Sequence, residues 1–177
     1  MDQAALDRVL ADDYVGDVTA LDMSDLRSKR AECQALEVGL SYQRRLAQGR
    51  LDIVGAERRR RSEGGEPTSH DDLVSSLAAT LADRGRPAGN GRLPQLMAPD
   101  AEDVDTSELD AIVGAGSLGS LADATDDELV QMVDALSTYE HDVSARRRAL
   151  HERIDALQAE ITRRYRTGEA SVESLLQ

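Results

Sequence analysis

Residues 37–52 read EVGLSYQRRLAQGRLD, and residues 140–155 read EHDVSARRRALHERID. The two stretches begin 103 positions apart and share one spacing of polar residues: Glu, three residues, Ser, two residues, Arg, three residues, Gln or His, three residues, Asp. At about 100° per residue on a helix, these five side chains occupy an arc of about 80° along about 22 Å. A solvated helix face has no reason to repeat such a set. The spacing therefore predicts two helices that hold an elongated polar ligand.

Apolar residues recur every seven positions through both stretches, which is typical of coiled-coil helices. The first series is Leu26, Cys33, Leu40, Ala47 and Val54, and the second is Leu129, Leu136, Val143, Leu150 and Leu157. Subtracting 103 aligns the two series, so the chain looks like an internal duplication. We expect an all-α fold built on two long helices that pair along these seams.

Charged motif residues occupy the companion heptad series, where apolar side chains would normally pack. Glu37 and Arg44 take these places in the first helix, and Glu140 and Arg147 take them in the second. Charges at a seam are costly unless they are paired. One interpretation is structural, with Glu37 paired to Arg147 and Arg44 paired to Glu140 between the helices. It leaves the accompanying Ser, Gln and Asp unexplained, so a bound ligand is the other interpretation.

Composition divides the chain into four segments. They are an acidic N-terminal segment (1–23), a first long helix (24–61), an acidic connector containing Gly and Pro (62–125), and a second long helix with a C-terminal turn (126–177). We expect the connector to be flexible.

Short helices flank the two long ones. The pattern predicts them over about 3–13, 70–84 and 107–113. Ser24 and Thr125 are candidate N-caps of the long helices, and Gly168 is expected to end the second one.

Net charge is −13, which argues against a general nucleic-acid binder and against direct DNA binding. The charge is uneven: residues 24–61 carry ten bases and five acids, whereas residues 62–125 carry twelve acids and three bases. This distribution suits a protein that holds an anionic ligand centrally and shows an acidic surface to a basic partner. Arg58–Arg61 is interpreted as a solvated helix end.

Several other classes of protein fit poorly. No run is apolar over the length of a membrane span, and the single Cys33 fits a reducing cytoplasm. The three histidines are scattered without the spacing of a metal site, and no nucleophile–base pair is evident. We therefore expect a cytoplasmic protein that is not an enzyme.

The repeated polar set suits a ligand that has both phosphates and guanines. An arginine fork pairs bidentately with a phosphate or with guanine O6 and N7. A carboxylate accepts the two donors that guanine presents at N1 and N2, and Ser and Gln can fill the remaining donors and acceptors. Arg45, Arg50, Arg146, Arg148 and Arg153 flank the motifs and are expected to support phosphate binding.

The motif Glu-x3-Ser-x2-Arg-x3-Gln-x3-Asp, met twice on heptad helices, resembles the RsiG family of actinobacterial anti-sigma factors. The resemblance covers both long helices. It implies an antiparallel coiled coil that holds a partially intercalated dimer of cyclic di-GMP. It also implies that the loaded protein sequesters WhiG, a flagellar-type sigma factor that controls late sporulation genes.

The same resemblance implies ten ligand contacts, five on each helix. They are Glu37, Ser41, Arg44, Gln48, Asp52, Glu140, Ser144, Arg147, His151 and Asp155. His151 stands where the family has Gln, and an imidazole can also donate or accept one hydrogen bond.

Two further expectations follow from antiparallel pairing about a two-fold axis. Glu37 should lie near Asp155, and Asp52 near Glu140. Without ligand, Arg44 and Arg147 should crowd the seam as unpaired like charges and loosen the helices.

The alternative function is a coiled-coil adaptor or RNA polymerase-binding factor that needs no ligand. An enzyme such as a cyclic dinucleotide phosphodiesterase fits less well, because it would need metal ligands.

Overall fold

The computed structural model describes residues 3–65, 104–114, 118 and 121–170, and every regular element in these ranges is helical. The elements with determined bounds are α1 (Gln3–Leu10), α2 (Met23–Ser62), α4 (Ser107–Val113), the 3-10 helix η2 (Leu121–Asp123) and α6 (Asp126–Thr167). The all-α prediction is confirmed. The predicted helix at 70–84, the C-terminal turn and most of the connector lie outside the described residues.

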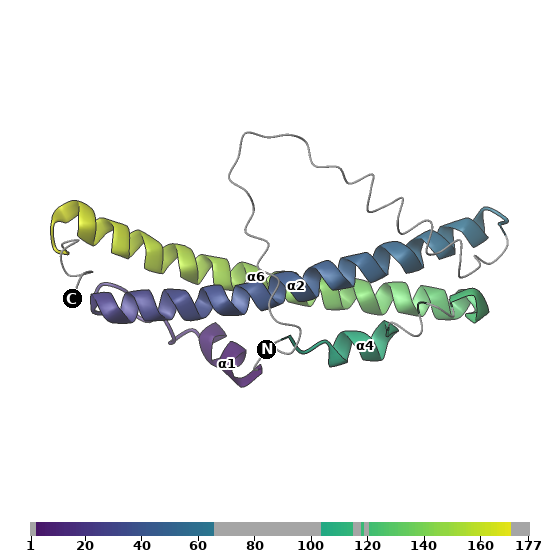
Figure 1. Cartoon of the computed structure of the whole chain (residues 1–177), viewed down its shortest axis with the longest axis horizontal. Coiled ribbons are helices and arrows are strands. Elements are labelled where there is room, and N and C mark those ends of the chain that lie inside the picture. The colour runs from purple at the N-terminus through teal and green to yellow at the C-terminus, as the bar shows by residue number, and fades with distance from the viewer. Residues whose placement is uncertain (1–2, 66–103, 115–117, 119–120, 171–177) are drawn as a thin grey trace. The chain divides into compact units, whose positions relative to one another are not determined.

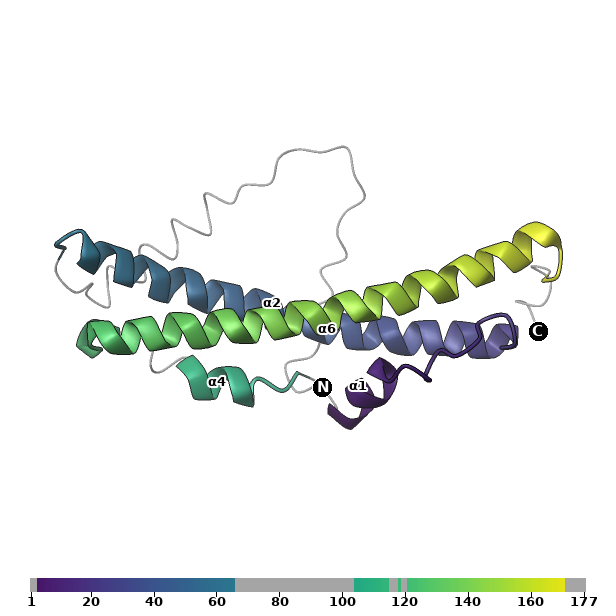
Figure 2. The ribbon, with the colours of Figure 1, turned by 180° about the vertical axis from the view of Figure 1, so that it is seen from behind.

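The chain forms two compact units, and each contains part of both long helices. The first unit holds α1, α2 up to Gln43 and α6 from Asp142 onward. The second unit holds α2 from Arg44 onward, α4, η2 and α6 up to His141. Within each unit, α2 and α6 lie side by side (Figures 1 and 2).

The two helices are antiparallel in each unit. In the first, Arg27 of α2 bonds Tyr165 of α6, and Glu37 farther along α2 pairs with Arg147 earlier on α6. In the second, the ion pairs are Arg44 with Glu140 and Arg61 with Asp126. Residue numbers therefore rise along one helix as they fall along the other, as predicted.

The predicted heptad seams form the core. Their members are no more than 2% exposed. The buried seam residues are Leu26, Cys33, Leu40, Ala47, Val54, Leu129, Leu136, Val143, Leu150 and Leu157. Leu6 and Val9 of α1 are buried in the first unit, and Leu109 and Val113 of α4 in the second. At about 1.5–3 kcal/mol for each fully buried large aliphatic side chain, this burial is the main stabilisation of the paired helices.

The ends of the long helices follow from local chemistry, with one correction. Thr125 caps α6 as predicted: its hydroxyl accepts from the Glu128 amide at 3.3 Å, and the Glu128 carboxylate accepts from the Thr125 amide at 2.7 Å. For α2 the predicted cap, Ser24, is wrong. The carboxylate of Asp22 accepts from the Asp25 amide at 2.8 Å and serves as the cap instead.

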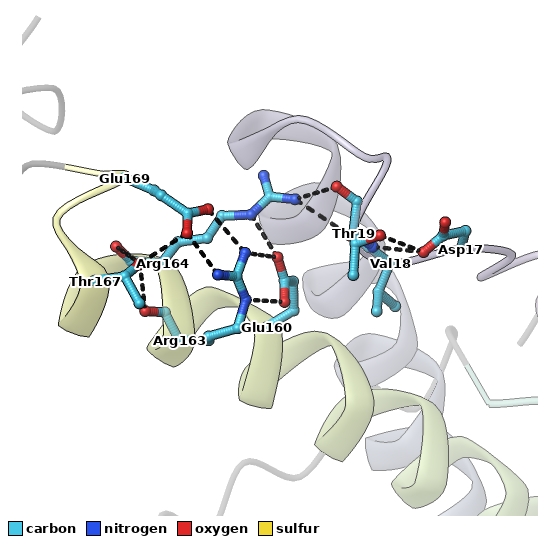
Figure 3. A network of polar contacts seen from close by, with 8 residues as sticks. All are labelled: Asp17, Val18, Thr19, Glu160, Arg163, Arg164, Thr167 and Glu169. Carbon is cyan, nitrogen blue, oxygen red and sulfur yellow. Dashed lines mark hydrogen bonds and ion pairs between the residues drawn. The ribbon is translucent and has the colours of Figure 1, made fainter.

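A buried glutamate and its arginine partners join the last turns of α6 to the segment that leads into α2. Glu160 is only 5% exposed and accepts hydrogen bonds from Arg163 and Arg164 (Figure 3). Arg164 also donates to the backbone carbonyls of Val18 and Thr19, at 3.3 and 3.0 Å. We call this set, a glutamate with its two arginines, a clasp.

The second unit contains the matching clasp near the end of α2. Glu57 is 2% exposed and accepts from Arg60 and Arg61, and Arg61 donates to the carbonyls of Leu121 and Ala122. All of these positions differ by 103 from those of the first clasp. Arg61 has a side chain only 11% exposed, so its assignment to a solvated helix end is wrong. The sequence alone does not show that Glu57 is buried.

Two glycines offer a test of helix energetics. A Cβ added at Gly55 inside α2, or at Gly64 after it, would meet no atom within 4 Å, but Gly64 has φ +81°. We expect Gly55→Ala to raise the free energy of unfolding by about 0.5–1 kcal/mol, because glycine weakens a helix interior. Gly64→Ala should lower it by about 1 kcal/mol, because an L residue is strained at that φ. Urea denaturation measures both, and equal effects would contradict this account.

The stability that the first clasp contributes depends on pH through Glu160. Hydrogen bonds from Arg163 and Arg164 lower the pKa of the Glu160 carboxyl to about 2, from an ordinary value of 4.5. Its ionisation therefore stabilises the fold above about pH 4.5, and this contribution is lost as the pH falls toward 2. We expect Glu160→Gln to lower the thermal midpoint near neutral pH.

The difference from the parent should narrow as the pH falls below 4.5, the ordinary pKa of the carboxyl. Circular dichroism followed over a pH series measures this. Glu152→Gln, at an exposed position of α6, is the control. A difference between Glu160→Gln and parent that stays constant down to the lowest pH would contradict the assignment.

Candidate functional site

The motif residues of α2 and α6 form a polar cluster in the first unit. The first cluster consists of Glu37 and Ser41 from α2, and Arg147 and His151 from α6. Arg147 Nε donates to Glu37 Oε1 at 2.7 Å and to Ser41 Oγ at 2.8 Å. Ser41 Oγ donates to Glu37 at 2.6 Å, and His151 Nε2 lies 3.3 Å from the same carboxylate. Glu37 is thus the acceptor at the centre of the cluster.

The electrostatics of Glu37 follow from this geometry. Its side chain is 18% exposed, and burial opposes ionisation. Hydrogen bonds from Ser41 and Arg147 outweigh that effect and hold the pKa of the Glu37 carboxyl below its ordinary value. The cluster is therefore built around an ionised carboxylate.

The second unit contains a related cluster. The second cluster consists of Arg44 and Gln48 from α2 and Glu140 from α6. Gln48 Nε2 donates to Glu140 Oε1 at 3.1 Å, and Arg44 Nη1 lies 3.6 Å from the same oxygen. Arg44 Nε is buried and has no hydrogen-bond partner among the described residues. A buried donor left without an acceptor costs about 1–3 kcal/mol in stability. The Nε donor of Arg44 is therefore available to an added acceptor.

A shift of 103 positions relates the two clusters. It converts the pair Arg147–Glu37 into Arg44–Glu140 and replaces His151 with Gln48. In both, a glutamate of one helix faces an arginine and a second side-chain nitrogen of the other. The clusters differ in their contacts: Arg147 approaches its glutamate through Nε, and Arg44 more loosely through Nη1.

The remaining three predicted residues lie beside these clusters along the helices. Ser144 is half-buried in the first unit, one helical turn after Glu140 on α6. Asp52 and Asp155 are exposed, one turn beyond Gln48 and His151 respectively.

The observed contacts change two expectations. Arg44 and Arg147 do not crowd the seam as unpaired charges, because each faces a glutamate of the opposite helix. Glu37 was expected near Asp155, but its contacts are with Arg147 and His151, which precede Asp155 by eight and four residues. The ion pairs of the structural interpretation are therefore both present.

Two of the flanking arginines serve a different purpose from the one predicted. Arg50 donates to the carbonyl of Val113 at the end of α4, and Arg153 donates to the carbonyl of Leu10 at the end of α1. Both guanidinium groups are engaged with short helices of their own units. Arg45 and Arg148 are exposed, and Arg146 is half-buried.

Sequence reasoning missed these helix-end contacts and the clasps, although a signal was present. The shift of 103 that aligns the motifs also maps Arg50 onto Arg153 and Glu57 onto Glu160. Comparing every residue at this shift, both inside the motif and beyond it, would have marked these positions as repeated.

The clusters have the chemistry of binding. Each offers a carboxylate as acceptor and a guanidinium as donor. The described residues contain no group of three or more His, Cys, Asp or Glu side chains placed to hold a metal ion. None of the helices in the described ranges combines the length and the apolar character needed to cross a membrane.

Comparison with known proteins places the chain in a family. No curated protein matches it. The model of the RsiG-like family matches residues 12–89 and 116–177, which include both long helices with their motifs. RsiG-like proteins are regulatory anti-sigma factors. The matched ranges make up most of the sequence, and the chain therefore belongs to the RsiG-like family.

Proposed function

We propose that the chain is an anti-sigma factor that binds cyclic di-GMP and, when loaded, sequesters a flagellar-type sigma factor of the WhiG kind. It would thereby repress late sporulation genes. Membership of the RsiG-like family supports the anti-sigma role. The observation that carries the ligand proposal is in the second cluster: the buried Nε of Arg44 has no hydrogen-bond partner among the described residues, and Nη1 lies 3.6 Å from Glu140.

The chemistry of the clusters suits a guanine nucleotide. A glutamate such as Glu37 or Glu140 can accept the N1 and N2 donors of guanine in two parallel hydrogen bonds. The arginine that this glutamate releases can then pair with a phosphate or with guanine O6 and N7. A bound ligand would thus replace each ion pair between α2 and α6 with two charge-assisted contacts between the ligand and the protein.

The number of clusters supports two ligand molecules per chain. Each unit supplies one carboxylate, one arginine and one further nitrogen donor, from Gln48 or His151. Two molecules of cyclic di-GMP carry about four negative charges, one for each bridging phosphate. The long helix α2 carries ten bases between residues 24 and 61, which favours such anions.

The ligand-free contacts suggest why the partner would depend on nucleotide. The Glu37–Arg147 and Arg44–Glu140 pairs hold the two helices in one arrangement. A ligand that binds better to another arrangement shifts the population toward it. We propose that the sigma factor recognises the shifted arrangement, with its basic DNA-binding regions against the acidic surface of the chain.

The second candidate is an anti-sigma factor or adaptor that needs no ligand. The same two ion pairs favour it, because they already satisfy most of the charge at the seam. The two candidates differ in what nucleotide does to partner binding.

Removing either motif arginine should abolish most ligand affinity. We expect Arg44→Ala and Arg147→Ala each to weaken cyclic di-GMP binding on the order of 100-fold, about 3 kcal/mol. The loss arises because a desolvated phosphate or guanine edge is left without its charged donor. Titration of each purified variant with the nucleotide measures the dissociation constant.

The matched control is Arg59→Ala. Arg59 is exposed on α2, and its side chain makes no hydrogen bond or ion pair among the described residues. Its affinity should equal that of the parent. Parent-like binding by both Arg44→Ala and Arg147→Ala would reject the motif as the site.

Capture of the sigma factor should require nucleotide. We expect purified WhiG-type sigma factor to be retained on the immobilised chain in saturating cyclic di-GMP and to be lost when nucleotide is omitted, because the ligand selects the binding arrangement. The Arg147→Ala variant should fail to capture it in either condition. Equal capture with and without nucleotide would favour the ligand-independent candidate, even if the nucleotide itself bound.

A further inference from the structure

An arginine inside the first motif holds a short helix. Arg50 lies between Gln48 and Asp52 in sequence, and its side chain is only 12% exposed. Its Nη1 donates to the carbonyl of Val113 at 2.6 Å, and its Nη2 donates to Asp110 at 2.5 Å. One guanidinium therefore donates to the carbonyl of the last residue of α4 and to one of its carboxylates.

The second motif contains the equivalent arginine. Arg153 lies between His151 and Asp155, and its Nη2 donates to the carbonyls of Leu10 and Ala11 at the end of α1, at 2.5 and 3.4 Å. The shift of 103 relates Arg50 to Arg153 and the accepting residue Val113 to Leu10. The same kind of contact therefore occurs at equivalent positions of both units and belongs to the structure of each.

The motif and the short helix occupy opposite faces of the same helical turn. Arg50 is two residues from Gln48 and two from Asp52, so it points about 160° away from each. The contact of Arg50 with α4 therefore lies on the side of α2 opposite Gln48, which donates to Glu140. The α1 contact has the same relation to His151 and Glu37 in the first unit.

We propose that Arg50 and Arg153 are positioning residues that report ligand occupancy of the motif to α4 and α1. This inference rests on the proposed function, because it takes cyclic di-GMP as the ligand. A ligand on Gln48 or His151 orders the helical turn that carries the arginine. The ordered turn holds the guanidinium on the end of the short helix, and so the short helix opens less often.

The coupling has a reciprocal consequence. If ligand stabilises the contact between Arg50 and α4, then that contact must strengthen ligand binding by the same factor. Each arginine acts within its own unit, so the effect of losing one should be confined to one short helix. General destabilisation of the fold would instead affect both short helices, so the two explanations can be told apart.

Hydrogen exchange of the full chain with and without saturating cyclic di-GMP tests the proposal. We expect the nucleotide to slow amide exchange in both α4 and α1 by about fivefold or more. In Arg50→Gln, the ligand-dependent slowing should disappear from α4 and persist in α1. In Arg153→Gln, it should disappear from α1 and persist in α4. Each variant should also bind the nucleotide about fivefold more weakly.

Two further variants guard against misfolding and non-specific effects. Arg50→Lys keeps a cation for Asp110 but cannot donate to two acceptors in the same geometry, so we expect partial ligand-dependent slowing in α4. Arg59→Gln, at an exposed position of α2, should match the parent throughout. Circular dichroism checks that the helices form in each variant.

The outcomes are distinguishable. Ligand-dependent slowing that persists in α4 of Arg50→Gln would overturn the inference, as would slowing lost equally from both short helices in one variant. Nucleotide binding that leaves α1 and α4 unaffected in the parent would overturn the inference alone. Failure of the parent to bind cyclic di-GMP in a titration would overturn the proposed function and this inference together.

Discussion

Glutamate–arginine pairs inside a heptad seam determine how α2 and α6 pack in each unit. An apolar side chain at Glu37 or Arg44 would give an ordinary coiled coil, stabilised by its leucines alone. The charges are half-buried, so each needs a partner from the opposite helix, and that requirement fixes the register of α2 against α6 in each unit. Such a seam is less stable than an apolar one, and it can exchange its ion pairs for an anionic, hydrogen-bonding ligand.

The internal repeat explains why so many contacts come in pairs. Within each unit, one repeat supplies the arginine and the other supplies the backbone that receives it: Arg61 binds the carbonyl of Leu121, and Arg164 binds that of Val18. The same exchange joins Arg50 to α4 and Arg153 to α1. The repeats are thus interdependent within both units, and the ligand motif is part of this reciprocal arrangement.

The seams and the paired helices could be predicted from the sequence, because heptad spacing depends only on helix geometry, and Leu40 is buried as expected. The partners of Glu37 were predicted only in part, since the exact register depends on side-chain contacts that periodicity does not contain. Arg61 was misassigned because a basic run at a helix end usually faces solvent. Here Arg61 forms an ion pair with the buried Glu57, and its side chain is therefore largely buried as well. Recognition of cyclic di-GMP was inferred from the motif and stays a prediction.

Calorimetric titration of the chain with cyclic di-GMP, and separately with cyclic di-AMP, would show whether the paired motifs bind guanine nucleotides. We expect saturable binding of two molecules of cyclic di-GMP per chain and no binding of cyclic di-AMP. Adenine lacks the N1 and N2 donors that Glu37 and Glu140 would accept from guanine. Absence of saturable cyclic di-GMP binding, or equal binding of both nucleotides, would contradict the claim that the paired motifs form a guanine nucleotide site.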